Sequence, residues 1–342
     1  MKKGRIIIIL FIIIVFFVNP KTMGKIKVYF NNDKVKTIKE LNIDSNENTS
    51  VLNYKNNLIV YDGKYLKALD EKGQKSFDLN IEAKEFYINS SKYIDILDKH
   101  NKIAYSIDHN GTIVFKNQFT KTPISFKSVN DKIFIYHYKY NKNEYIDLYE
   151  INNNKIKTIP VKGTLTDLDI ANNNIILTYM NTQENLVSII DKYDLKGNII
   201  NTNKFKNKMF IETEYLNNKF YCIDTNSVYI LNNNLDVKED ISIDNDIEFI
   251  GNTNKYIVVI DDKNNLIHIG DKLELKKKNI MNDIKGISYY DNSYIVYSDN
   301  EIKNTLDNNK HDFDSKIYKI INISDKTIAV LQNKKLSLLY IN

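Results

Sequence analysis

Pairs of acidic residues recur at alternating positions in three segments of this sequence. They are Asp167 and Asp169 in "LTDLDI", Glu212 and Glu214 in "FIETEY", and Asp246 and Glu248 in "DIEFI". Residues i and i+2 of an extended strand point to the same side. If the three segments line one axis, their carboxylates converge and could bind a cation such as Ca²⁺ or a basic partner. The alternative is a solvated polar face on half-exposed strands.

The other residue types that carry chemistry show no catalytic or metal-binding spacing. None of the five histidines lies in H-E-x-x-H or in a spaced Cys/His set, and we interpret them as structural or solvated: His100, His109, His137, His268 and His311. The single cysteine, Cys222, alternates with apolar neighbours in "NKFYCID", which favours a buried small side chain. No G-x-S-x-G, G-x-G-x-x-G or phosphate loop occurs. The sequence therefore predicts no catalytic residue and no cofactor other than the Ca²⁺ considered above.

The charge distribution is typical of a mixed soluble surface. The 48 basic and 43 acidic residues are interspersed and give a net charge of +5, which does not indicate a nucleic-acid partner. The one dense basic run, "KLELKKKN" at 272–279, is expected to be an outer-edge strand with protective lysines.

Short apolar runs that recur along the chain predict the architecture. Eight of them begin with a polar turn, at residues 56, 91, 131, 173, 218, 254, 292 and 325. Their spacings range from 33 to 45 residues, and each run has further strand-like segments on both sides. A period of about 40 residues with four strands per unit is typical of a β-propeller.

The turns agree with this interpretation. A D-x-x-G pattern occurs between the third and fourth expected strands of three units, in "LDEKGQ" (69–74), "IDHNGT" (107–112) and "YDLKGN" (193–198). Asp at the start and Gly at a left-handed position suit a tight hairpin. A second segment, "YHYKYNKNEY" (136–145), is expected to contain a long polar, aromatic loop that could act at a contact surface.

We therefore predict an all-β protein in which residues 25–342 form a β-propeller of eight four-stranded blades. The last unit has three strands, so an N-terminal strand from residues 33–43 is expected to complete it and close the ring. Spare strand material lies at 25–30. Seven blades remain an alternative if residues 284–315 pack irregularly. A β-solenoid or two stacked sandwiches are more distant alternatives.

Residues 1–24 form a separate segment with the pattern of a signal anchor. Basic residues precede thirteen apolar ones, residues 6–18, which include Ile6, Ile9, Phe11, Ile14, Phe17 and Val18. This run is short for a membrane span, which favours a cleaved signal, whereas the weak cleavage region favours an uncleaved anchor. We expect a single-pass protein of the cell membrane with its propeller on the extracytoplasmic side, or a secreted protein if the signal is cleaved.

The repeat layout resembles the WD-repeat-like and quinoprotein-like β-propellers. It is most similar to exported, N-terminally anchored propeller proteins of low-GC Gram-positive bacteria. Trp is absent here, so the W-D dipeptide and the docking tryptophans of quinoprotein blades are missing. This departure argues against a quinone cofactor.

The expected function is binding. A membrane-tethered propeller would act as a scaffold or recognition module for a protein or a cell-wall polymer, presenting its loops and central mouth. One alternative is a propeller enzyme, a hydrolase or a lyase, with an acidic axial site. Another is a sensory or assembly partner of a membrane complex. The fold by itself does not separate these alternatives.

Overall fold

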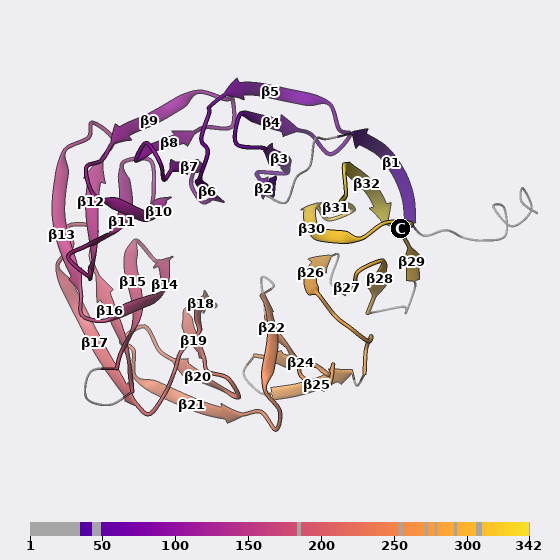
Figure 1. The fold of residues 1–342 in the computed structure, drawn as a ribbon. Coiled ribbons are helices and arrows are strands. Elements are labelled where there is room, and N and C mark those ends of the chain that lie inside the picture. The colour runs from indigo at the N-terminus through magenta and orange to yellow at the C-terminus, as the bar shows by residue number, and fades with distance from the viewer. Residues whose placement is uncertain are drawn as a thin grey trace, which may run out of the picture.

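The computed structural model describes residues 35–42, 49–182, 186–252, 256–270, 273–277, 279–290, 293–305 and 310–341. Within these residues the chain forms 32 β-strands and no helix. The strands make eight antiparallel four-stranded sheets, arranged as blades around a central axis (Figure 1). The predicted eight-bladed propeller is confirmed. Residues 284–315 contribute a regular blade, so the seven-bladed alternative is wrong.

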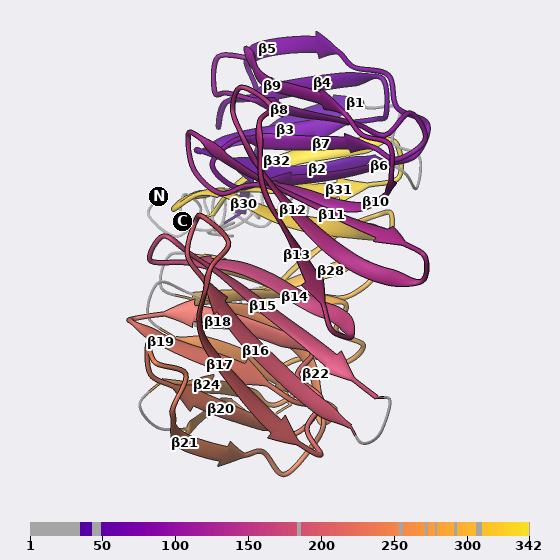
Figure 2. The same ribbon diagram turned by 90° about the vertical axis from the view of Figure 1, so that its left-hand side faces the viewer.

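Seven of the blades are built from four consecutive strands. Blades 1 to 4 contain β2–β5 (Ser50–Tyr54, Asn57–Tyr61, Tyr65–Leu69, Lys75–Asn80), β6–β9 (Phe86–Ser90, Ile94–Asp98, Ile103–Ile107, Ile113–Gln118), β10–β13 (Thr122–Ser128, Ile133–Tyr140, Asn143–Glu150, Lys155–Val161) and β14–β17 (Thr164–Ala171, Asn174–Asn181, Val187–Tyr193, Ile199–Lys206). Blades 5 to 7 contain β18–β21 (Glu212–Leu216, Lys219–Ile223, Ser227–Leu231, Val237–Ser242), β22–β25 (Ile247–Asn252, Ile257–Asp261, Leu266–Ile269, Leu273–Lys277) and β26–β29 (Gly286–Tyr290, Ser293–Tyr297, Glu301–Asn304, Lys310–Asp312). In each blade the first strand lies nearest the axis, and the fourth strands form the outer wall that Figure 2 shows from the side.

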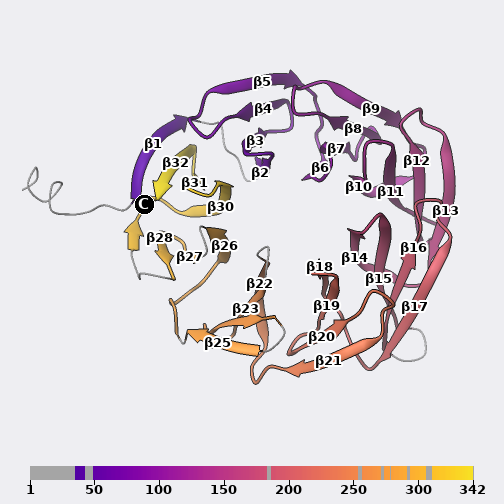
Figure 3. The same ribbon diagram turned by 180° about the vertical axis from the view of Figure 1, so that it is seen from behind.

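The eighth blade joins the two ends of the propeller. It contains β30–β32 (Ile317–Ser324, Thr327–Gln332, Lys335–Ile341) and, as its outer strand, β1 (Val35–Asn42). The antiparallel register pairs Val35 with Ile341 and Asn42 with Lys335, with a bulge at Ile38. Figure 3 shows β1 outside β32, at the edge of this blade. The prediction that residues 33–43 complete the last blade is confirmed, whereas the segment 25–30 lies outside the described residues.

The hydrophobic core lies between blades. Ile146 and Leu148 of blade 3, for example, pack in one cluster with Ile175 and Leu177 of blade 4. The second and third strands are buried along most of their length because a neighbouring blade covers each face. Burying an aliphatic side chain of this size contributes about 1.5–3 kcal/mol, so each blade depends on its neighbours for stability.

The D-x-x-G turns adopt the predicted tight connections. The N–H groups of Asn110 and Thr112 donate to Asp108 Oδ1 at 2.9 and 2.8 Å. Gly111 has a φ of +82°, and a Cβ at this position would lie 2.8 Å from Cγ of Phe77 in the preceding blade. Glycine is needed here both for the backbone conformation and for the close contact between blades.

Other local predictions had mixed outcomes. The basic run at 272–279 supplies β25, the outer strand of blade 6, and Cys222 on β19 is fully buried, as expected. Burial raises the pKa of the Cys222 thiol, so it stays protonated. The expected long loop within 136–145 is wrong. Strands β11 and β12 extend through it, and Asn141 and Lys142 form a two-residue turn with positive φ angles of 49° and 66°.

The predicted signal anchor, residues 1–24, lies outside the described residues. Across the part of the chain that the structure describes, no helix is long and apolar enough to cross a bilayer. Membrane attachment therefore remains a prediction.

The closure of the ring can be tested on β1. Leu41 packs against the apolar cluster formed by residues of blades 8 and 1, whereas Ile38 is 39% exposed at the bulge. We expect Leu41→Asp to lower the free energy of unfolding by about 2 kcal/mol, because a carboxylate would enter an apolar interface. The matched change Ile38→Asp should cost less than about 0.5 kcal/mol. Urea unfolding of both variants measures this, and equal losses would show that β1 does not seal the ring.

Candidate binding cavity formed by the inner strands

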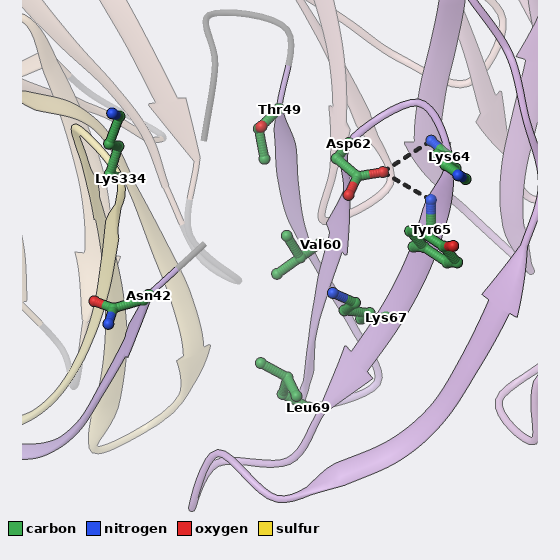
Figure 4. A pocket seen from close by; sticks show the side chains of 9 residues that line it. All are labelled: Asn42, Thr49, Val60, Asp62, Lys64, Tyr65, Lys67, Leu69 and Lys334. Atoms are coloured by element: carbon green, nitrogen blue, oxygen red, sulfur yellow. Dashed lines mark hydrogen bonds between the residues drawn. The ribbon is translucent and has the colours of Figure 1, made fainter. Parts of the chain in front are cut away.

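One cavity lies at the junction of blades 8 and 1. Its volume is about 700 Å³, and Figure 4 shows Asn42 and Lys334 on one side of it, opposite Thr49 and Val60. Asp62 on its wall accepts hydrogen bonds from two backbone N–H groups and so stabilises a turn. The chain that joins Asn42 to Thr49 is not among the described residues, so we place no functional site here.

A second cavity, which we call the axial cavity, is formed mainly by the first strands of blades 2, 3 and 4. Its volume is about 400 Å³. Its lining is mostly polar and comes from β6, β10, β11 and β14: Tyr87, Asn89, Ser90, Ile124, Ser125, Lys127, Ile135, His137, Leu165, Thr166, Asp167 and Leu168. These first strands lie nearest the axis in Figure 1, so the cavity lies on the inner side of blades 2, 3 and 4.

Two β-bulges shape this wall. The pairing of β10 with β11 shifts register between Pro123 and Ser125, and that of β14 with β15 shifts between Leu165 and Asp167. A bulge bends a strand and re-aims the side chains beside it. Both shifts fall on strands that line the axial cavity, immediately before Ser125 and Asp167.

Charged groups of both signs border the axial cavity. Lys127 Nζ lies 3.6 Å from Asp169 Oδ1 and donates to the carbonyl oxygen of Leu168 at 3.3 Å. These contacts link blade 3 to blade 4. Lys127 is therefore a partly buried cation that is held in place on the cavity wall.

Asp167 is a half-buried carboxylate at the junction of blades 4 and 5. The backbone N–H of Thr213 donates to Asp167 Oδ2 at 2.9 Å, and the N–H of Leu168 donates to Oδ1 at 2.7 Å. Burial raises the pKa of Asp167 to about 6 against the effect of these hydrogen bonds, with a smaller contribution from the charge of Asp169. Asp167 can thus exchange a proton near neutral pH.

Glu212 and Glu214 form a hydrogen-bonded pair on β18, next to Asp167. Burial raises the pKa of Glu212 to about 7, and the charge of Glu214 and a hydrogen bond with it act in the same direction. Two carboxyl groups that are hydrogen-bonded to each other hold a proton more tightly than either would alone.

The acids predicted from the sequence therefore divide into groups. Asp167, Glu212 and Glu214 come together, and Asp169 pairs with Lys127, whereas Asp246, just before β22, and Glu248 on β22 are exposed. Among the described residues, no group of three or more His, Cys, Asp or Glu side chains is arranged to hold a metal ion. Calcium binding stays a prediction.

A hydrogen-bonded chain on blade 3 was not predicted. His137 Nε2 lies 3.1 Å from Glu144 Oε2, and His137 Nδ1 lies 3.4 Å from Ser125 Oγ. Glu144 Oε2 also accepts from the backbone N–H of Leu165, at 3.1 Å. Burial lowers the pKa of His137 although Glu144 acts in the opposite direction, so the imidazole is neutral at physiological pH. Ser125 and His137 are 12 positions apart in the sequence, and His137 and Glu144 are 7 apart, so their proximity depends on strand register.

Blades 3 and 4 each contain a buried hydrogen-bond network that the sequence analysis did not predict. Asp191 accepts hydrogen bonds from the hydroxyls of Tyr179, Tyr193 and Thr202 at 2.9, 3.0 and 2.7 Å. Asp147 has the equivalent partners in blade 3, namely Tyr138, Tyr149 and Thr158. A repeated D-x-Y followed by Thr eleven residues after the Asp could have indicated it. These networks are fully paired inside the blades, which indicates a structural role.

Comparison with protein families identifies the chain. A family model described as "Family of unknown function (DUF5711)" matches residues 28–341. The chain belongs to the DUF5711 family. No curated protein matches its sequence.

Solved structures agree with the fold of this DUF5711 member. BamB from Moraxella catarrhalis has a TM-score of 0.61 and 7% identity over 90% of this chain and 99% of its own. Sqt1 from Saccharomyces cerevisiae has a TM-score of 0.62 and 7% identity, with the same coverage. Virginiamycin B lyase from Staphylococcus aureus has a TM-score of 0.53 and 10% identity over 90% of this chain and 100% of its own. At such identities the similarity establishes the fold alone.

The carboxyl pair on β18 should make stability depend on pH. The pKa of Glu212 is raised from its ordinary value of 4.5 to about 7 in the folded state, so folding takes up a proton and this contribution is lost as the pH rises through that range. Glu212→Gln should therefore raise the free energy of unfolding near pH 8 by about 1 kcal/mol, a value reduced for solvent screening. The gain over the wild type should vanish below the ordinary pKa of 4.5. Thermal unfolding at pH values on both sides of this range measures the gain, and a gain that does not change with pH would contradict the raised pKa of Glu212.

Proposed function

We propose that this protein is a binding or scaffold module that holds a partner at the mouth of the central channel. The observation that carries the proposal is the axial cavity, which three neighbouring blades line with polar and charged groups. A concave site with a few convergent polar groups on a rigid framework is the usual form of a binding site.

The chemistry of the axial cavity favours a polar partner. Lys127 and Asp167 offer opposite charges, and Asn89 and the phenol of Tyr87 offer neutral hydrogen-bonding groups. Burial raises the pKa of Tyr87, so its hydroxyl stays a donor. Such a lining suits a segment of a protein or a cell-wall polymer with hydroxyl, amide and carboxylate groups. The mixed charge does not make the basic patch that a nucleic acid would require.

The proposed location is the outer side of the cell membrane. The apolar run at residues 6–18, with basic residues before it, supports a signal anchor that tethers the propeller. A tethered module would meet its partner in two dimensions at high effective concentration, so a modest affinity at one cavity would be enough. If the segment is cleaved, the same module is secreted.

A hydrolase or lyase with an acidic axial site is the alternative function. It is supported by the proton-binding group of Asp167, Glu212 and Glu214, since acids with raised pKa values suit acid–base chemistry. The geometry favours binding, because both carboxylate oxygens of Asp167 already accept hydrogen bonds from backbone N–H groups that hold this side chain between blades 4 and 5.

Photo-crosslinking tests the binding function. Placing p-benzoylphenylalanine at Tyr87 in the full chain should give a discrete adduct with a protein or wall polymer in growing cells. Lys127→Met should reduce that adduct severalfold, because it removes the cation of the cavity wall. The same photo-crosslinker at Ile199, which is 57% exposed on the outer wall, serves as the control position. Equal adducts at both positions, or an adduct unaffected by Lys127→Met, would contradict the proposal.

Fractionation tests the tether. We expect the full chain to sediment with membranes and to resist extraction by carbonate. The double change Ile9→Asp and Phe11→Asp should release most of it into the soluble fraction, because each charge near the bilayer centre costs about 2.5–3.5 kcal/mol. The double change Lys25→Asp and Lys27→Asp, outside the apolar run, is the control. Wild-type protein in the soluble fraction at its full length would contradict a membrane anchor.

A further inference from the structure

We propose that Ser125, His137 and Glu144 form a serine-hydrolase site that cleaves a carboxylic ester bound in the axial cavity. This activity goes beyond the binding function and does not use the axial acids. The three residues lie on the adjacent strands β10, β11 and β12 of blade 3. Serine, histidine and a carboxylate within hydrogen-bonding reach are the parts of a nucleophilic acyl-transfer centre, whatever the fold that carries them.

The backbone places the serine against the histidine. Ser125 and His137 are directly paired across β10 and β11, so their side chains share one face of the sheet. The register shift just before Ser125 aims its side chain at the axial cavity, which both residues line. The Oγ to Nδ1 distance of 3.4 Å is loose, as such contacts commonly are before a substrate binds.

The carboxylate fixes which ring nitrogen carries the proton. Glu144 Oε2 lies 3.1 Å from His137 Nε2 and accepts from the N–H of Leu165 in blade 4. A carboxylate accepts, so Nε2 is the protonated nitrogen of the neutral ring and Nδ1 carries a free lone pair toward Ser125. His137 is thus set as a general base, and Glu144 is a positioning residue anchored from two blades.

The surroundings distinguish this serine from the structural ones. Ser106 and Ser128 donate to Asp95, but all three side chains are completely buried. Ser125 is half-buried and faces a cavity of about 400 Å³. A nucleophile must reach a substrate, and Ser125 meets this condition where the sealed serines do not.

The reaction balances without a cofactor. Ser125 Oγ attacks the ester carbonyl carbon while its proton moves to His137 Nδ1, and the imidazolium is stabilised by Glu144. The carbon–oxygen bond to the alcohol breaks, and the proton on Nδ1 passes to the departing oxygen. Water then attacks the acyl-serine, gives a proton to Nδ1 and releases the acid, and Ser125 Oγ recovers the proton. The net change is ester plus water to acid plus alcohol.

The cavity indicates the class of substrate. Its volume suits a small acyl group on a polar alcohol, such as an acylated sugar hydroxyl. Lys127 lies two residues from Ser125 on the same side of β10 and lines the same cavity, so its charge favours the negative oxygen of the tetrahedral intermediate. An ester is the expected linkage because its alcohol leaves more readily than an amine.

Labelling and kinetics test the site. The full chain in detergent should react with a fluorophosphonate probe, and mass spectrometry should place the adduct on Ser125. It should also hydrolyse p-nitrophenyl acetate. Ser125→Ala should abolish labelling and lower kcat at least 100-fold. Ser76→Ala, which changes an exposed serine on the outer strand β5 of blade 1, should leave both unchanged.

The pH profile separates a positioning role from a structural one. Hydrolysis needs neutral His137, whose pKa Glu144 raises, so Glu144→Gln should lower kcat and move the acidic limb of the rate profile to lower pH. An adduct on another serine, no adduct on the folded wild type, or hydrolysis that persists in Ser125→Ala would overturn the proposal. Thermal unfolding of each variant confirms that it is folded. The photo-crosslinking at Tyr87 reports on partner binding separately, so either proposal can fail without the other.

Discussion

Every blade of this protein has two apolar faces, and the structure depends on burying both of them. A flat four-stranded sheet with buried second and third strands is not stable in water by itself, so each blade needs a neighbour on either side. A closed ring is the arrangement that leaves no terminal face. Closure is achieved by β1, which pairs with β32 although some 300 residues separate Val35 from Ile341. The N-terminal strand of the propeller therefore holds its C-terminal blade in place.

Closing the ring creates a second requirement at the axis. The edges of the first strands face one another there, and their polar groups need hydrogen-bond partners. Side chains of these strands bond to the backbone of the next blade. Asn53 Nδ2 donates to the carbonyl oxygen of Asn322 at 2.7 Å, and Asn322 Nδ2 donates to that of Tyr289 at 2.7 Å. Charged side chains make such links too: Lys127 Nζ and Lys319 Nζ donate to carbonyl oxygens of the following blade, and Asp167 accepts from the N–H of Thr213.

Blade 3 shows how such a link can acquire a second use. Glu144 binds the N–H of Leu165 and so ties the second-to-third hairpin of blade 3 to the inner strand of blade 4. The same oxygen orients His137 toward Ser125. A buried polar network must be fully paired to be tolerated, and that requirement holds the imidazole in one orientation. Rigidity needed for stability thus supplies the preorganisation that a catalytic or binding site needs.

The sequence by itself determined the repeat, the number of blades, the closing strand and the D-x-x-G turns, because these follow from local patterns of apolar and turn-forming residues. It did not reveal that blade 5 makes the same turn with Asn232 in place of Asp and Leu235 in place of Gly, at a φ of 62°. The buried core of blade 5 compensates there for the strained backbone, since Leu235 is completely buried.

The sequence also predicted that Asp167, Glu212 and Glu214 could converge, but not that Asp246 would be exposed. The axial cavity and the Ser125–His137–Glu144 chain were decided by the tertiary structure alone. The reason is physical: strand register and the position of a bulge determine which distant side chains meet, and both are set by how whole blades pack rather than by any local pattern.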